Sequence, residues 1–230
     1  MCGRLDQNHT ALDYIAALRW AGRVLSRSVA APSDNATPGT CRPLMRIVDD
    51  QLILDDHVWG YRADWAEGKL PVTINARLEK LTGRYWASLL HTGRAIVPAD
   101  GWYEWTGEKG RKVPWHVHLK SAQPVFLAAL VAPGEGRQLA PATGFAMVTA
   151  DAEGGMVDIN DRLPISLSAS DALRWLDPSR SAQEALHLAR SVALGPEAFA
   201  WHAVTRDLRP PQTSAAPAPA SGTAQLELPL

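Results

Sequence analysis

The sequence has few cysteines and no long apolar runs. Its 230 residues include only two cysteines, Cys2 and Cys41, which is too few for a disulfide framework and fits a reducing compartment. The longest apolar run, residues 124–133, falls short of the ~20 residues that span a bilayer. The first residues contain no apolar segment, so no secretory signal is expected. These absences predict a cytoplasmic protein.

An excess of charge of either sign is also absent. Lys and Arg together number 23 against 24 Asp and Glu, giving a net charge of −1. This balance argues against a surface coated in positive charge for bulk nucleic-acid binding, although a few well-placed arginines can still hold phosphates. Nine Trp stand against three Phe. This balance fits either core packing or stacking on bases, and composition does not decide between them.

The hydropathy pattern predicts one α+β domain over residues 1–209. A capping box at Thr10 and Asp13 precedes apolar residues at helical spacing, which predicts a helix over about 10–25, followed by an ordered loop over 26–40. Two further helices are expected near the end, one capped by Ser168 and one over about 182–193. Short β-like runs punctuated by Gly and Pro lie between them and predict a largely antiparallel sheet system. These runs cover 46–48, 52–54, 95–97, 115–119, 125–131 and 145–149.

The last twenty residues differ in composition from the rest. Residues 210–224 carry no charge and no large apolar side chain, so they cannot offset their ordering entropy and are expected to form a flexible linker. Residues 225–230, Gln-Leu-Glu-Leu-Pro-Leu, restore three leucines. They fit either a frayed terminus or a docking peptide on a disordered spacer.

Cys2 offers a chemistry that no internal cysteine has. Removal of Met1 would leave an α-amine that titrates near ~7.7–8.0 beside a thiol that titrates near ~8.5, and Arg4 would lower the thiol pKa further. Such an aminothiol condenses with an aldehyde and closes a thiazolidine ring intramolecularly. The plain alternative is a chance residue at position 2.

Other candidate residues lie inside the β-like runs. Asn75 belongs to a polar segment that follows such a run, and Glu104 lies between bulky aromatics that would desolvate its carboxyl and raise its pKa. His116 and His118 alternate along a strand, as a metal pair could. With no third ligand apparent, a plain strand face is favoured. Cys41 is interpreted as a buried packing residue, and residues 55–57 as a turn.

Together these segments resemble the SRAP (SOS-response-associated peptidase) family, whose members shield abasic sites in single-stranded DNA. The likeness covers about residues 1–206 and implies a single domain of mainly antiparallel sheets, with an open barrel-like core and flanking helices. The matching segments are Met1–Arg4, Asn35 with Pro38-Gly39, Trp59-Gly60, Asn75–Glu79, Pro98–Trp105, Asp161–Pro164 and Trp201–Thr205.

The resemblance also implies roles for individual residues. Cys2 would link covalently to the aldehyde of a ring-opened abasic sugar, Asn75 would orient the sugar, and Glu104 would move protons. The residues expected to hold phosphates are Arg4, Arg77 and Arg162, and those expected to line the site are Gly3 and Thr149. The family is also thought to remove its own Met1. No cofactor and no metal are expected, and the protein would act as a monomer at the nucleoid.

The sequence departs from the family pattern at two places. Asn160 replaces a His, and an amide cannot exchange protons near neutral pH. Sugar ring opening, strand cleavage and crosslink reversal are therefore in doubt, whereas crosslinking through Cys2 and Glu104 is not. After Thr205 the chain also enters the linker where the family continues with a strand.

Two other functions remain open on the sequence. One is a cysteine autopeptidase or amidohydrolase that uses Cys2 as an N-terminal nucleophile, and the other is a non-catalytic DNA-binding variant. The C-terminal peptide resembles a motif that binds the bacterial sliding clamp. The residues expected to enter the clamp are Gln225, Leu226, Leu228 and Leu230.

Overall fold

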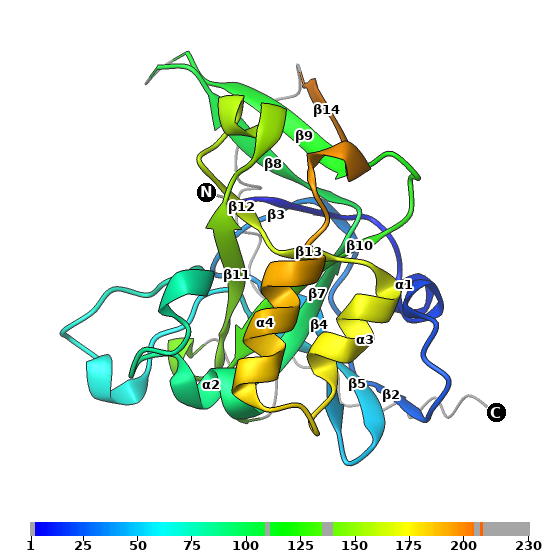
Figure 1. Cartoon of the computed structure of the whole chain (residues 1–230), viewed down its shortest axis with the longest axis vertical. Helices are drawn as coiled ribbons and strands as arrows, with labels where there is room; N and C mark the ends of the chain where they lie inside the picture. Colours follow the sequence, from blue (N-terminus) through cyan, green and yellow to red (C-terminus); the bar gives the residue numbers. More distant parts are fainter. Residues whose placement is uncertain (1–2, 109–110, 135–139, 205–207, 209–230) are drawn as a thin grey trace.

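The molecule is built from three layers (Figure 1): helices, a large sheet and a smaller sheet. The computed structural model describes residues 3–108, 111–134, 140–204 and 208. The predicted linker and C-terminal peptide lie outside these residues. None of the helices described combines the length and apolar character needed to cross a membrane.

The smaller sheet is antiparallel and carries the N-terminal strand at its interior. Its strand order is β14-β9-β8-β1-β3. Its strands are β1 (Leu5–Gln7), β3 (Ser33–Ala36), β8 (Gly101–Thr106), β9 (Val113–Leu119) and β14 (Phe199–Ala203).

The large sheet follows the order β12-β11-β10-β7-β4-β5-β2, with β13 paired to β10 and β6 to β11. It is mostly antiparallel, but β2 runs parallel to β5 and β6 parallel to β11. The expected α+β class with antiparallel sheets is confirmed, whereas no closed barrel is found among the described strands. The strands are β2 (Val24–Ser26), β4 (Cys41–Val48), β5 (Gln51–Val58), β6 (Asn75–Arg77), β7 (Arg94–Ala99), β10 (Val125–Val131), β11 (Phe145–Asp151), β12 (Arg162–Pro164) and β13 (Ser166–Leu167).

The central strand β10 shows why the sequence holds a continuous apolar run there. Successive side chains of a strand point to opposite faces, and β10 is buried on both. Phe126 and Leu130 pack in the core on the helical side. Val125 and Leu127 pack in the second core, which also contains Leu5 and Trp102 of the smaller sheet.

Each longer helix begins at a side-chain cap. Thr10 and Ser181 form capping boxes, and Ser168 caps the helix that follows it, as the sequence predicts for Thr10 and Ser168. The α-helices are α1 (Ala11–Leu18), α2 (Ala87–Thr92), α3 (Ala169–Leu176) and α4 (Ala182–Val192). Short 3-10 helices cover Asp64–Ala66, Leu78–Lys80, Pro141–Thr143, Gly154–Asp158 and Pro196–Ala198.

The first predicted helix is wrong at its C-terminal end. The helix ends at Leu18 because Arg19 adopts the left-handed conformation, with φ of 58°. The residues expected in its last turn instead belong to β2, which pairs with β5. The segment expected as a loop over 26–40 contains the strand β3.

The predicted turn at residues 55–57 is also wrong, because Asp55, Asp56 and His57 are buried within β5. Asp55 is paired on both sides, with its Oδ2 2.8 Å from Arg46 Nη2 and its Oδ1 3.2 Å from His57 Nε2. Asp55 is paired with Arg46, and Asp56 accepts hydrogen bonds from Ser28 Oγ and two backbone N–H groups. Buried carboxylates with such partners are not revealed by a linear polarity pattern. Cys41, expected to be buried, begins β4 and is partly exposed.

Candidate functional site

Glu104 lies where the two sheets meet. It belongs to β8 of the smaller sheet and is fully buried. Asn160 Nδ2 donates a hydrogen bond to Glu104 Oε2 at 2.6 Å, and Asn160 Oδ1 accepts one from Arg162 N at 3.1 Å. Because Arg162 begins β12 of the large sheet, Asn160 connects the two sheets through its side-chain amide.

Burial sets the protonation of this carboxyl. Desolvation raises the pKa of Glu104 to about 7, and the negative charge of Asp161 acts in the same direction, while the hydrogen bond from Asn160 partly opposes the shift. The raised pKa that the sequence predicts is confirmed, but the flanking aromatics are not its cause. Side chains alternate along a strand, so Tyr103 and Trp105 face the other side and Trp102 shares the face of Glu104. A carboxyl with a pKa near 7 can both donate and accept a proton at neutral pH.

The N-terminal segment runs along β8 toward Glu104. Tyr103 N donates to Arg4 O at 3.0 Å, and Leu5 pairs with Trp102 in antiparallel register. Arg4 therefore lies opposite Tyr103, and continuing this register by one more step places Gly3 opposite Glu104. Cys2 lies outside the described residues.

The side chain of Arg4 contacts groups of its own chain. Its Nη1 donates to Asn35 Oδ1 at 2.8 Å and to Leu208 O at 2.9 Å, and its guanidinium lies 6.0 Å from the ring centre of Trp105. Asn35 belongs to a segment that matches the family pattern. Its side-chain amide positions the Arg4 guanidinium close to the first residues of the chain.

Asn75, Arg77 and Thr149 come from neighbouring strands of the large sheet. In the parallel pair β6 and β11, Asn75 lies beside Met147 and Arg77 beside Thr149. Thr149 is fully buried, and its hydroxyl has no hydrogen-bond partner among the described residues. Such an orphaned hydroxyl is uncommon in a protein interior. Arg77 is exposed, as a residue that meets phosphates from solvent must be.

Arg162 differs from the other two arginines expected at phosphates, because acidic side chains form ion pairs with its guanidinium. Its guanidinium lies 2.6 Å from Asp151 Oδ1 and 3.0 Å from Glu79 Oε2, and it also donates to Thr149 O at 2.9 Å. The structure therefore shows Arg162 holding Thr149 and two carboxylates in place. Sequence reasoning did not single out Glu79 or Asp151, although Glu79 ends a segment that matches the family pattern.

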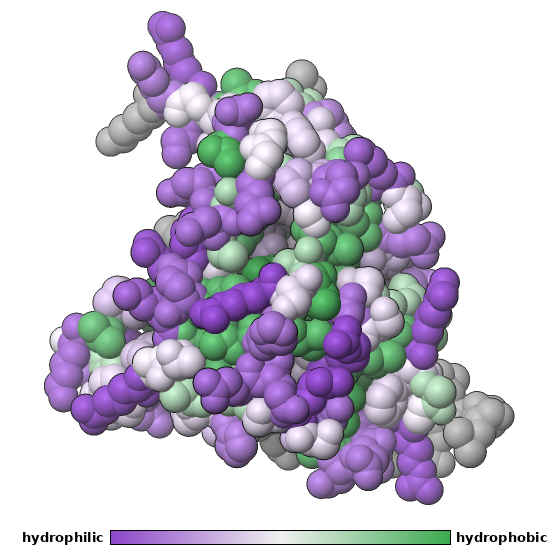
Figure 2. Space-filling view, in the orientation of Figure 1, coloured by the Kyte–Doolittle hydropathy of each residue, from purple (hydrophilic) through white to green (hydrophobic). Residues whose placement is uncertain are grey.

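A groove lies beside this site, between the smaller sheet and α4, and Figure 2 shows apolar surface in the hollow. Its volume is about 370 Å³, and Trp102, Glu79 and Asp151 are among its lining residues. Neither Glu104 nor Asn160 lines it. The groove is also lined by Glu153 and Arg190, so side chains of both charges face it.

The structure brings together much of the predicted site. Glu104 and Asn160 are in contact, as are Thr149 and Arg162. The register of β1 and β8, extended to Gly3, places it opposite Glu104. The carboxyl of Glu104, which can exchange protons, therefore lies close to the first described residues of the chain. Cys2, the expected nucleophile, precedes them in the sequence. Three residues able to hold a metal, His116, His118 and His202, lie on the opposite face of the smaller sheet.

The chain combines two open sheets, a buried carboxyl where they meet, and an N-terminal strand that leads toward this carboxyl. The chain belongs to the SOS response associated peptidase (SRAP) family, whose model matches residues 1–211. It is 38% identical over 213 residues to the abasic site processing protein YedK of Escherichia coli, a match that covers 90% of this chain and 93% of the relative.

More distant relatives and solved structures agree with this assignment. The abasic site processing protein HMCES of Xenopus tropicalis is 24% identical over 72% of this chain and 61% of its own. A crystal structure of a phage-related protein from Bordetella bronchiseptica has a TM-score of 0.76 at 38% identity and covers 89% of this chain and 95% of that one. A Bacteroides thetaiotaomicron protein shares the fold, with a TM-score of 0.70 at 19% identity, covering 88% of this chain and 92% of its own.

Proposed function

We propose that the protein binds abasic sites in single-stranded DNA and links to them covalently through Cys2. The observation that carries the proposal is the placement of Glu104. This buried carboxyl, with a pKa of about 7, lies opposite Gly3, and Cys2 is one peptide bond further on. Relatives named abasic site processing proteins support the choice of substrate.

The reaction begins with removal of Met1, in which water cleaves the Met1–Cys2 peptide bond and frees the α-amine. The amine then adds to the aldehyde of the ring-opened sugar and gives a carbinolamine. Loss of water forms an imine, and the Cys2 sulfur adds to the imine carbon to close a thiazolidine. The condensation releases one water and needs no oxidant or reductant. Glu104 donates a proton to the departing hydroxyl and takes it back when the ring closes.

Residues around Glu104 would position the sugar and its phosphates. Asn75 lies on β6 beside β11, and the buried hydroxyl of Thr149 is available to a hydroxyl of the ligand. The exposed Arg77 and the partly exposed Arg4 would meet the flanking phosphates, which fix the register of a strand without reading its sequence. Arg162 would position Thr149 through its guanidinium and Asn160 through its backbone N–H. Because this guanidinium also contacts two carboxylates, we assign no phosphate to it.

We further propose that Asn160 makes the adduct persistent. Reversal needs a proton at the thiazolidine sulfur or nitrogen, and an amide does not supply one near neutral pH. Asn160 can only donate a hydrogen bond to Glu104, so a single carboxyl serves both directions of the reaction. Strand cleavage, which would need a further proton transfer, is correspondingly disfavoured.

The C-terminal peptide extends this proposal to the replication fork. Residues 225–230 lie outside the described residues, and their sequence resembles a sliding-clamp-binding motif. Gln225 would hydrogen-bond at the rim of the clamp pocket, and Leu226, Leu228 and Leu230 would enter apolar subsites. Each buried leucine contributes about 1.5–3 kcal/mol before ordering costs. The uncharged linker would keep the domain at a high local concentration near the fork.

A denaturing gel tests the central step. Protein is mixed with a single-stranded oligonucleotide that carries one abasic site, and a matched oligonucleotide with an intact base serves as the control. We expect a denaturation-resistant band with the abasic strand alone. A cysteine peptidase without this activity, or a protein that only binds DNA, would give no such band, and this outcome would refute the proposal.

A further inference from the structure

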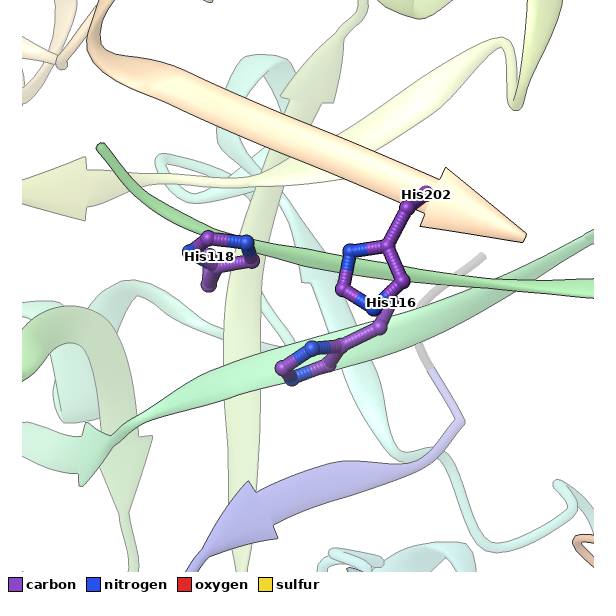
Figure 3. Close-up of side chains that lie close together, drawn as sticks. All are labelled: His116, His118 and His202. Carbon is purple, nitrogen blue, oxygen red and sulfur yellow. The ribbon is translucent and has the colours of Figure 1, made fainter. Parts of the chain in front are cut away.

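Three histidines gather on one face of the smaller sheet. His116 and His118 lie two residues apart on β9, and His202 on β14 pairs directly with His116. The rings stack or meet edge to face, with centroids 5.3 to 5.7 Å apart. Figure 3 shows the three imidazoles directed toward one another from the two strands. The sequence indicates only the pair on β9, because the third histidine follows more than eighty residues later.

This face is separate from the site at Glu104. Tyr103, the residue before Glu104, pairs with His116, whereas Glu104 pairs with Trp115. Because neighbouring side chains of a strand point to opposite sides, the histidines and Glu104 lie on opposite faces of the same sheet. The proposed DNA chemistry therefore does not use the histidines.

Oxygen atoms lie beside two of the three rings. The buried His116 Nε2 lies 3.0 Å from Asp6 Oδ2, and His118 Nδ1 lies within hydrogen-bond distance of Leu119 O, at 3.0 Å. An oxygen acceptor at Nδ1 of His118 holds the proton there and leaves the lone pair of Nε2 available to a metal. A carboxylate or carbonyl behind a histidine is the usual support of a metal-bound imidazole.

Gly101 makes room for this arrangement. A Cβ at position 101 would lie 2.6 Å from His116 Nε2 and 2.4 Å from Val117 O. Asp6 pairs with Gly101 in the neighbouring strand, so the absence of a side chain there lets the His116 ring reach the Asp6 carboxylate. The sheet therefore contains a position shaped around the imidazole of His116.

We propose that His116, His118 and His202 form a binding site for a zinc-class divalent transition-metal ion. One ligand atom from each histidine lies within 4.8 Å of the others. Tetrahedral zinc with Zn–N distances of 2.0–2.1 Å needs nitrogens about 3.3 Å apart, so each ring would move inward by about 1 Å. His202 is exposed and His118 only partly buried, which leaves their side chains room to do so. The fourth position is open to water.

The three ligands come from two hydrogen-bonded strands of the smaller sheet. A metal at this position would connect β14, the outermost strand of the smaller sheet, to β9.

The test uses untagged protein that has been treated with a chelator and dialysed. We expect isothermal titration with ZnCl₂ to give one site per chain, and a thermal midpoint that rises with zinc. The change His202→Ala, combined with His118→Ala, should weaken binding at least tenfold and remove the thermal shift. His187→Ala serves as the matched control, because His187 is an exposed histidine of α4, and it should change neither measurement.

Two outcomes would overturn the proposal: no saturable zinc binding by the wild-type chain, or binding that survives the double substitution. Thermal unfolding in chelator shows whether the double variant folds. If it does not, the single change His202→Gln at the exposed position replaces it, with the same tenfold loss expected.

Discussion

The environment of Glu104 determines the chemistry that its carboxyl can perform. Its carboxyl is buried between two sheets, and burial raises its pKa to about 7. A group that is half protonated at neutral pH matches the demands of imine formation, which needs an acid for the departing water and then a base for the thiol. The free α-amine of Cys2 has an ordinary pKa of ~7.7–8.0, so the two groups titrate over adjoining pH ranges.

Crosslinking should therefore show a bell-shaped pH profile. The rate rises as the amine loses its proton and falls as Glu104 loses its own above pH about 7. Glu104→Gln should slow crosslinking by about 10²–10⁴-fold, since a general acid contributes that much, and should abolish the alkaline limb. Rates of band formation on denaturing gels between pH 5.5 and 9 measure both effects. A variant that keeps the alkaline limb would show that another group supplies the proton.

The same pKa shift has a consequence for stability. A carboxyl whose folded-state pKa is raised stabilises the fold below its unfolded value of 4.5 and loses this contribution as the pH rises through about 7. The shift corresponds to about 3 kcal/mol. Glu104→Gln should therefore unfold at higher temperature than wild type at pH 8.5, and the gain should shrink at pH 5. Calorimetry at the two pH values measures the difference in unfolding temperature between the variant and wild type. A difference that does not depend on pH would show that the raised pKa of Glu104 is not its cause.

Asn160 offers a third prediction at this scale. A histidine in its place can bring a proton to the adduct, so Asn160→His should shorten the adduct lifetime. The measurement follows loss of the labelled adduct in the presence of an excess of unlabelled abasic oligonucleotide. Asn160→Gln is the control, because it keeps an amide. An unchanged or longer lifetime in the histidine variant would refute the role given to Asn160.

At the scale of elements, local signals and long-range contacts explain different parts of the fold. The caps at Thr10 and Ser168 and the apolar run of β10 are legible in the sequence, because capping and burial act within a few residues. The end of α1 at Arg19 and the strand 55–57 are not. Arg19 adopts a left-handed conformation, and Asp55 is compensated by Arg46 across the strand pair. The pairing of Asp55 depends on a partner in another strand, and no local pattern marks Arg19 as left-handed.

The capping box of α4 gives a prediction for an element. Ser181 accepts from Glu184 N, and Glu184 Oε2 accepts from Ser181 N. Ser181→Ala should cost about 1 kcal/mol, which lowers the thermal midpoint by roughly 2–4 °C in a domain of this size. Ser191→Ala near the end of the same helix is the control and should change stability by no more than about 0.5 kcal/mol. Equal losses in both variants would show that the cap contributes nothing.

At the scale of the whole molecule, the candidate site is assembled from both sheets. The sequence marks Asn75, Glu104, Thr149 and Arg162 as separate segments through their likeness to a family, and the fold brings Asn160 to Glu104 and Arg162 to Thr149. The ion pairs of Arg162 and the third histidine were not predictable, since nothing in a linear pattern tells which distant side chains will meet. The near-neutral net charge is compatible with the proposed DNA binding, in which only Arg4 and Arg77 would face phosphates.

The C-terminal residues 210–230 give a further prediction for the whole molecule. A peptide of residues 210–230 should bind the bacterial sliding clamp with micromolar affinity in calorimetry, and Gln225→Ala with Leu228→Ala should abolish the binding. Deleting the same residues from the full chain should leave crosslinking to a free oligonucleotide unchanged, because Glu104 and Cys2 are retained. Absence of micromolar binding, or binding that is unaffected by the two substitutions, would remove the clamp from the proposal.

The covalent link through Cys2 is tested most directly by intact mass spectrometry. Protein is measured before and after mixing with a single-stranded oligonucleotide carrying one abasic site. We predict a starting mass that lacks Met1 and a product heavier by the mass of the abasic strand less one water, with no product from Cys2→Ala. An adduct formed by Cys2→Ala, or by a form that retains Met1, would contradict the account, and so would the absence of any adduct with the wild-type protein.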